Sequence, residues 1–95
     1  MVDEDYIKKI RQHIDRIDMV LITAMAERLS LMPEIAQYKK EKEIPIFDEV
    51  REVQIMDRLK KVAKENGLEE GFVEEIFLSV FNEAKRIQKE FMDKE

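Results

Sequence analysis

Apolar residues recur at helical spacing through three stretches of the chain. The first stretch runs from Asp3 to Lys42 and contains one proline and no glycine. Steps of three or four residues along it give a stripe on which apolar and charged side chains alternate: Ile7, Arg11, Ile14, Asp18, Leu21, Met25, Arg28, Met32, Ile35 and Lys39. Such a stripe normally faces a core or another helix. The pattern predicts one long helix over residues 3–42, with a kink and not a break at Pro33.

Two shorter helices are predicted after a loop over residues 40–47. Asp48 is placed to cap the second helix, which runs to about Asn66, and Gly67 is the expected stop signal. The third helix extends from residue 69 or 70 to Met92, with apolar residues at three-and-four spacing. No stretch alternates as a strand does. The fold class is therefore all-α, with one long and two shorter helices in a single domain over residues 1–95.

The predicted long helix exceeds what its own chain can cover. About 40 helical residues span about 60 Å, whereas a compact domain of this size has a radius of gyration of about 12 Å. The other two helices, about 28 Å and about 35 Å long, cannot cover both of its sides. A second copy of the chain would cover it, and symmetric dimers are the commonest oligomers. We therefore expect an intertwined homodimeric helical bundle.

The composition narrows the class of partner. Charged residues make up 41% of the chain and the net charge is −5, which argues against a basic nucleic-acid-binding surface. The chain has no cysteine, so it has no disulfide framework and no thiolate metal site. It begins with acidic residues and contains no apolar run of membrane length. We expect a cytoplasmic protein that binds neither nucleic acid nor membrane.

Three cations interrupt the apolar stripe of the first helix. Arg28 and Lys39 are eleven residues apart, or about 16 Å along one face, so two long side chains leaning together can hold one small dianion. Arg11 lies about 25 Å before Arg28, too far to reach the same small molecule from the same helix. In an antiparallel dimer it could enter the site of the partner.

Polar residues on the other two helices extend this candidate anion site. Asp48, Arg51 and Glu52 open the second helix on one face, and Gln88 lies on the inward stripe of the third. A buried cation is costly unless it is paired or bound to a ligand, so cations and an amide on apolar faces indicate an anion pocket. The alternative is that the cations extend into water and the cluster is a cap with a surface ion pair.

The same residues, taken in order, resemble the all-helical AroQ-class chorismate mutases. The resemblance covers nearly the whole chain and is carried by these segments: Arg11, Ile14-Asp15-Arg16-Ile17-Asp18, Ala26-Glu27-Arg28, Tyr38-Lys39, Ile44-Pro45-Ile46, Asp48-x-x-Arg51-Glu52 and Ala84-Lys85-x-x-Gln88. It implies an intertwined three-helix dimer with two equivalent sites, each completed by an arginine from the other chain. The implied reaction is the Claisen rearrangement of chorismate to prephenate, a step in phenylalanine and tyrosine biosynthesis from the shikimate pathway. That rearrangement requires no nucleophile, metal or cofactor.

The resemblance implies a role for each residue at the reacting end of the substrate. Arg28 and the partner's Arg11 would hold the two carboxylates of chorismate. Lys39 would bind a carboxylate and the ether oxygen, and Gln88 would donate to that oxygen from the other side. Together they would select the compact substrate conformer and stabilise the negative charge that develops on the ether oxygen.

Asp48 and Glu52 would receive the ring hydroxyl, with Arg51 ordering this corner of the site. Two residues depart from the family pattern. Ala84 stands where the family often carries a hydroxyl residue that contacts a carboxylate, and the loss of a hydrogen bond to a charged group costs about 1.5 to 3 kcal/mol. Pro33 would alter the spacing of Arg28 and Lys39.

Two other functions fit the same fold. An isochorismate pyruvate lyase has a similar cationic site, but the Asp-x-x-Arg-Glu pattern at Asp48, Arg51 and Glu52 favours the mutase. A non-catalytic helical dimer with a regulatory or interaction role would tolerate the loss of Lys39 or Gln88, and both are present.

Overall fold

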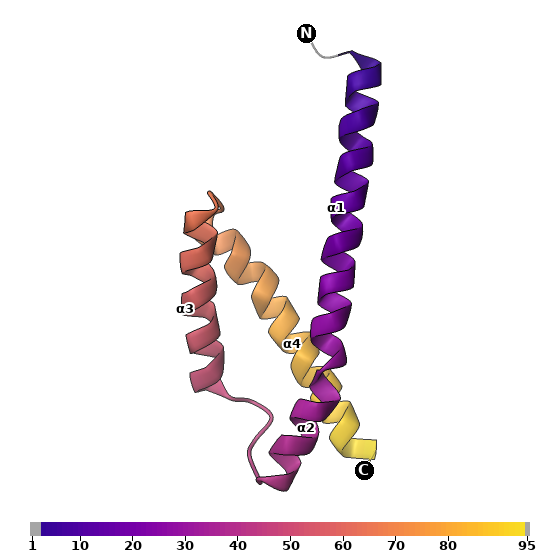
Figure 1. Cartoon of the computed structure of the whole chain (residues 1–95). Coiled ribbons are helices and arrows are strands. Elements are labelled where there is room, and N and C mark those ends of the chain that lie inside the picture. The colour runs from indigo at the N-terminus through magenta and orange to yellow at the C-terminus, as the bar shows by residue number, and fades with distance from the viewer. Residues whose placement is uncertain (1–2, 95) are drawn as a thin grey trace. The chain divides into compact units, whose positions relative to one another are not determined.

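The computed structural model describes residues 3–94, which form four α-helices and no strand (Figure 1). The helices are α1 (Glu4–Ser30), α2 (Met32–Glu41), α3 (Glu49–Glu65) and α4 (Glu70–Lys94). The all-α prediction is confirmed. The described residues divide into two compact units, one up to Ser30 with α1 and one from Leu31 with α2, α3 and α4.

The prediction of one long helix over residues 3–42 with a kink and no break is wrong. The helix ends at Ser30 and a new helix begins at Met32. Pro33, in the first turn of α2, has no N–H to donate to the carbonyl of Leu29, so the hydrogen-bond ladder is interrupted there. Leu31 nevertheless keeps a right-handed helical backbone, with φ −85° and ψ −9°, and its carbonyl accepts from the N–H of Ile35. The interruption is one residue long.

Charged residues lie at both ends of helix α1. The carboxylate of Asp3 accepts a hydrogen bond from the backbone N–H of Tyr6 at 2.9 Å, and Arg28 lies in the last turn. Both placements complement the helix dipole. No residue of α1 is buried, and apolar stripe residues such as Ile14 and Leu21 are 47% and 56% exposed.

In the second unit, α4 packs against both α2 and α3 (Figure 1). The small core of this unit contains residues from all three helices: Ala36 of α2, Met56 and Ala63 of α3, and Val73, Phe81, Ala84 and Gln88 of α4. Alanine at three of these positions allows close approach of the helices. Gln88, 4% exposed, is the polar member of this buried set. No helix within residues 3–94 combines the length and apolar character needed to cross a membrane.

Two similar C-caps set the direction in which the chain leaves α2 and α3. After α3, the N–H groups of Gly67 and Leu68 bond back to the carbonyls of Lys64 and Ala63, with Gly67 at φ 72°. This is a Schellman motif, and it confirms the predicted stop at Gly67. After α2 the same pattern places Glu43 at φ 56°, a left-handed conformation that costs a residue other than glycine about 1 kcal/mol. The chain accepts this strain at the start of the loop that leads to the candidate site.

Candidate active site

Lys39 and Gln88 form the centre of the candidate site, although 49 residues separate them in sequence. The Nζ of Lys39, on α2, donates to Oε1 of Gln88, on α4, at 3.0 Å. It also donates to the carbonyl oxygen of Ile46, in the loop before α3, at 2.7 Å. The structure therefore brings these two predicted residues together.

The contact with Lys39 fixes the orientation of the Gln88 amide. An ammonium group only donates, so the amide oxygen must face Lys39 and the amide N–H₂ must face away. The Nε2 of Gln88 lies 3.5 Å from the Sδ of Met32, which is a weak acceptor. The buried amide thus keeps strong donor capacity for a better acceptor.

The charge on Lys39 depends on residues from three parts of the second unit. Burial of its ammonium is the largest influence and lowers the pKa of Lys39 below its ordinary value. The carboxylates of Asp48 and Glu52 raise that pKa, and the positive charge of Lys85 lowers it. These four side chains therefore form one electrostatic cluster.

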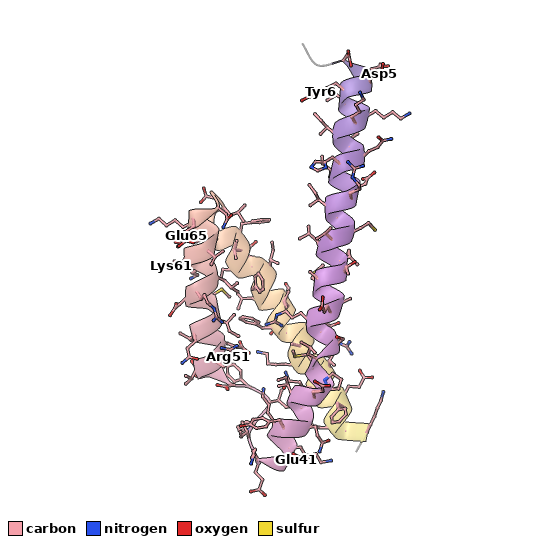
Figure 2. All side chains as sticks on the ribbon, viewed as in Figure 1. Asp5, Tyr6, Glu41, Arg51, Lys61 and Glu65 are labelled. Atoms are coloured by element: carbon pink, nitrogen blue, oxygen red, sulfur yellow. The ribbon has the colours of Figure 1, made fainter. Side chains whose placement is uncertain are left out.

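Asp48 begins α3 in the predicted way. Its carboxylate accepts from the backbone N–H of Arg51 at 3.0 Å, and its carbonyl accepts from the N–H of Glu52 at 3.0 Å. Arg51 lies in the first turn of α3 with an exposed side chain (Figure 2). Glu52 is half-buried, one helical turn after Asp48 and therefore on the same face of α3.

Lys85 and Phe47 lie beside Glu52 and Asp48, and neither was predicted from the sequence as a site residue. The Nζ of Lys85 lies 3.0 Å from Oε2 of Glu52 and 4.6 Å from the centroid of the Phe47 ring. An ammonium over an aromatic face is attracted by the ring quadrupole. The available signal was the position of Lys85, three residues before Gln88 and hence on the same side of α4.

Three consecutive loop residues connect the site to its helices. The carbonyl of Ile46 accepts from Lys39, the ring of Phe47 lies under Lys85, and the side chain of Asp48 caps α3. Each contact comes from a different helix. The loop therefore holds α2, α3 and α4 in a fixed relation around the Lys39–Gln88 pair.

Of the remaining predicted residues, Ala84 lies in the second unit, whereas Arg11 and Arg28 lie in the first. Ala84 is 6% exposed on α4, and its methyl group cannot supply a hydrogen bond. Arg11 and Arg28 lie on α1, in the other unit, where Arg11 is exposed and Arg28 is half-buried. Their participation in the site stays a prediction.

The arrangement suits stabilisation of an oxygen that gains negative charge. Lys39 offers a cation and Gln88 a neutral donor, and preoriented donors of this kind contribute much of the rate acceleration in many enzymes. Asp48 and Glu52 offer acceptors for a hydroxyl group. Within residues 3–94 no group of three His, Cys, Asp or Glu side chains is arranged to hold a metal ion.

Comparison with known proteins identifies the sequence pattern. The family model for chorismate mutase type II matches residues 10–89. A chorismate mutase from Methanocaldococcus jannaschii is 36% identical over 85 residues, which cover 90% of this chain and 86% of that protein. A 4-amino-4-deoxychorismate mutase from Streptomyces venezuelae is 25% identical over 95 residues, covering 100% of this chain and 92% of that protein. A bifunctional chorismate mutase/prephenate dehydratase from Buchnera aphidicola is 27% identical over 94 residues, which are only 24% of its length.

Proposed function

Since the chain belongs to the chorismate mutase type II family, we propose that it catalyses the rearrangement of chorismate to prephenate. The observation that carries this proposal is the Lys39–Gln88 contact, in which a cation and a buried amide meet at 3.0 Å. The rearrangement breaks the ether C–O bond and forms a C–C bond within one molecule. It therefore requires orientation and charge stabilisation, and no group is transferred to the protein.

In the proposed mechanism the ether oxygen of chorismate accepts hydrogen bonds from Lys39 and Gln88. As the C–O bond breaks, negative charge gathers on that oxygen, and both donors interact with it more strongly than in the ground state. The N–H₂ of Gln88 exchanges its weak sulfur contact for this oxygen. Lys39 also contacts a substrate carboxylate.

The other end of the substrate meets the carboxylates of Asp48 and Glu52, which we call the acidic corner. We assign Asp48 and Glu52 as acceptors for the ring hydroxyl, with Arg51 ordering the first turn of α3. Ala84 contributes shape and no hydrogen bond. Carboxylate binding then depends on cations supplied by α1.

We further propose that the protein acts as an intertwined homodimer in which Arg28 and the partner's Arg11 bind the two substrate carboxylates. Support comes from α1, which spans 27 residues, or about 40 Å, and has no buried residue. Its exposed apolar stripe is a surface that a second copy can bury, at about 25 cal/mol for each Å² removed from water.

Sharing of sites between chains predicts complementation of inactive variants. Arg11→Ala and Arg28→Ala should each be inactive alone, and an equal mixture after subunit exchange should recover about one quarter of wild-type activity. Half of the dimers are then mixed, and each mixed dimer has one complete site out of two. Steady-state rates before and after exchange measure this, with exchange verified by mass-tagged chains.

A matched mixture controls for nonspecific rescue. Arg28→Ala and Lys39→Met alter residues that one chain contributes to the same site, so their mixed dimers have no complete site and should stay inactive. Equal recovery in both mixtures, or none in the first, would contradict the assignment of Arg11 to the partner's site.

The catalytic proposal is tested by offering the wild-type protein chorismate and isochorismate separately. We expect chorismate to be consumed, as followed by ultraviolet absorbance, with prephenate as the product by proton NMR, and no release of pyruvate from isochorismate. Release of pyruvate would identify a lyase. If neither substrate reacts faster than it does without the protein, the remaining reading is a non-catalytic dimer of the same fold.

A further inference from the structure

The acidic corner of the site is not a pair of free carboxylates. Glu52 is engaged by Lys85 at 3.0 Å, and the two side chains are only 23% and 27% exposed. Ion pairs that are half removed from water are screened less by salt and solvent than surface pairs. The charge of Lys85 is therefore a fixed feature of this corner.

Phe47 restricts where the Lys85 ammonium can go. The ring centroid lies 4.6 Å from Nζ, and Phe47 directly precedes Asp48, the residue that caps α3. Lysine side chains are otherwise mobile, with about 2 kcal/mol of rotamer entropy. An aromatic face and a carboxylate together hold the ammonium against the corner at which the substrate ring substituent is proposed to bind.

Pairing with Lys85 leaves Glu52 able to accept a hydrogen bond. A carboxylate has two oxygens and about four acceptor sites, and Lys85 contacts Oε2. A neutral hydroxyl can donate to the other oxygen or to Asp48. A positively charged ring substituent would gain less from a carboxylate that is already neutralised, and it would also be repelled by Lys85.

This distinction matters because two ring substituents occur among the substrates named for the relatives. One relative is named for chorismate and another for 4-amino-4-deoxychorismate, which carries an amino group in place of the C4 hydroxyl. An aliphatic amine is largely protonated at neutral pH. The substituent at C4 is therefore a neutral donor in chorismate and a cation in 4-amino-4-deoxychorismate.

We propose that Lys85 is a positioning residue that makes this site selective for a C4 hydroxyl over a C4 ammonium, by neutralising Glu52. The proposal rests on the function proposed above and names the residue that sets its substrate preference. Removing one unit charge a few ångströms from another, at the effective dielectric constant of a partly exposed site, changes an equilibrium by about tenfold or more.

The test compares kcat/KM for chorismate and for 4-amino-4-deoxychorismate in Lys85→Met and Lys85→Gln. In both variants we expect the ratio to move by about tenfold or more towards the amino substrate, because Glu52 becomes a free carboxylate. Lys85→Arg keeps the positive charge and should keep the wild-type preference. Phe47→Leu should move the ratio in the same direction by a smaller factor.

The chain provides a matched control for a purely structural role. Lys60 and Glu74 form a second ion pair between α3 and α4, at 3.3 Å, two turns beyond Glu52 along α3. Lys60→Met should alter rates for both substrates equally and leave their ratio within about twofold. Circular dichroism would establish that each variant is folded.

The outcomes separate the two proposals. If the wild-type protein rearranges chorismate but Lys85→Met and Lys85→Gln leave the ratio unchanged, Lys85 has no role in selectivity and only this inference fails. An equal shift in Lys60→Met would also overturn it. If the wild-type protein rearranges neither compound, the proposed function fails, and this inference fails with it.

Discussion

Replacing Lys39 by methionine should lower kcat for chorismate by about 10² to 10³. Methionine has a similar length and keeps the packing against α4, but it cannot donate to the ether oxygen. Two contacts are lost in the free protein, one to Gln88 and one to the carbonyl of Ile46. The buried Oε1 of Gln88 loses its donor, which costs about 1 to 3 kcal/mol, and removal of the buried ammonium offsets part of that cost, so the free energy of unfolding should fall only modestly. The expected result is a folded protein with little remaining activity.

Lys61→Met is the matched control for this variant. Lys61 lies on α3 with an exposed side chain (Figure 2). Its replacement removes the same charge from the protein and should leave kcat within about twofold. A folded Lys39→Met variant that kept more than about a tenth of the wild-type kcat would show that Lys39 does not stabilise the ether oxygen.

The lowered pKa of Lys39 also shapes the alkaline side of the wild-type pH profile. Lys39 must be protonated to donate, so activity falls as the pH rises through its pKa, and burial brings this fall below the ordinary lysine value. The profile of kcat/KM reports the free protein, whereas that of kcat reports the complex. A bound dianion raises the pKa of Lys39 again, so the fall in kcat should come at higher pH.

Most helix ends of the second unit were predictable because local chemistry fixes them. Asp48 caps the start of α3 with its own side chain, and Gly67 ends the helix with a left-handed backbone. Both signals are local, so both ends of α3 could be predicted from the sequence. The break at Leu31 was missed because hydrophobic periodicity continues through Pro33 while the hydrogen-bond ladder does not. Hydrophobic periodicity shows which face of a helix is apolar, but it does not show an interruption of one residue in the hydrogen-bond ladder.

The candidate site was predictable only in part. The predicted residues Lys39 and Gln88 meet in the structure because α2 packs on α4, a contact between residues far apart in sequence. Lys85 belongs to the sequence pattern, but no role could be predicted for it, because its contacts with Glu52 and Phe47 depend on how the helices and the loop pack. Spacing along one helix shows which residues share a face, but it cannot show which residues of other helices face them.

Replacing Gln88 by glutamate should make the activity depend strongly on pH, with the highest rate in acid. An amide donates at every accessible pH, so the wild-type profile should be flat from about pH 6 until Lys39 begins to lose its proton. In Gln88→Glu the introduced carboxyl donates only when protonated. Once ionised it pairs with Lys39 and places negative charge beside the ether oxygen, so the rate near neutral pH should fall by about 10² or more.

The direction of the change follows from the ionisation of that carboxyl. Above its pKa the protonated fraction, and with it the rate, falls about tenfold per pH unit, so the variant should be most active in acid. The ammonium of Lys39 favours ionisation, whereas burial and the substrate's negative charge oppose it. Gln54→Glu, at an exposed position of α3, adds the same charge as a control and should keep the flat profile.

The pH dependence of kcat for Gln88→Glu tests most directly whether residue 88 donates to the breaking bond. We expect activity in acid that declines as the pH rises, whereas the profiles of the wild-type protein and Gln54→Glu stay flat from about pH 6 until Lys39 begins to lose its proton. A flat profile for Gln88→Glu at a rate close to that of the wild-type protein would contradict this expectation, because the buried amide beside Lys39 would then take no part in stabilising the ether oxygen.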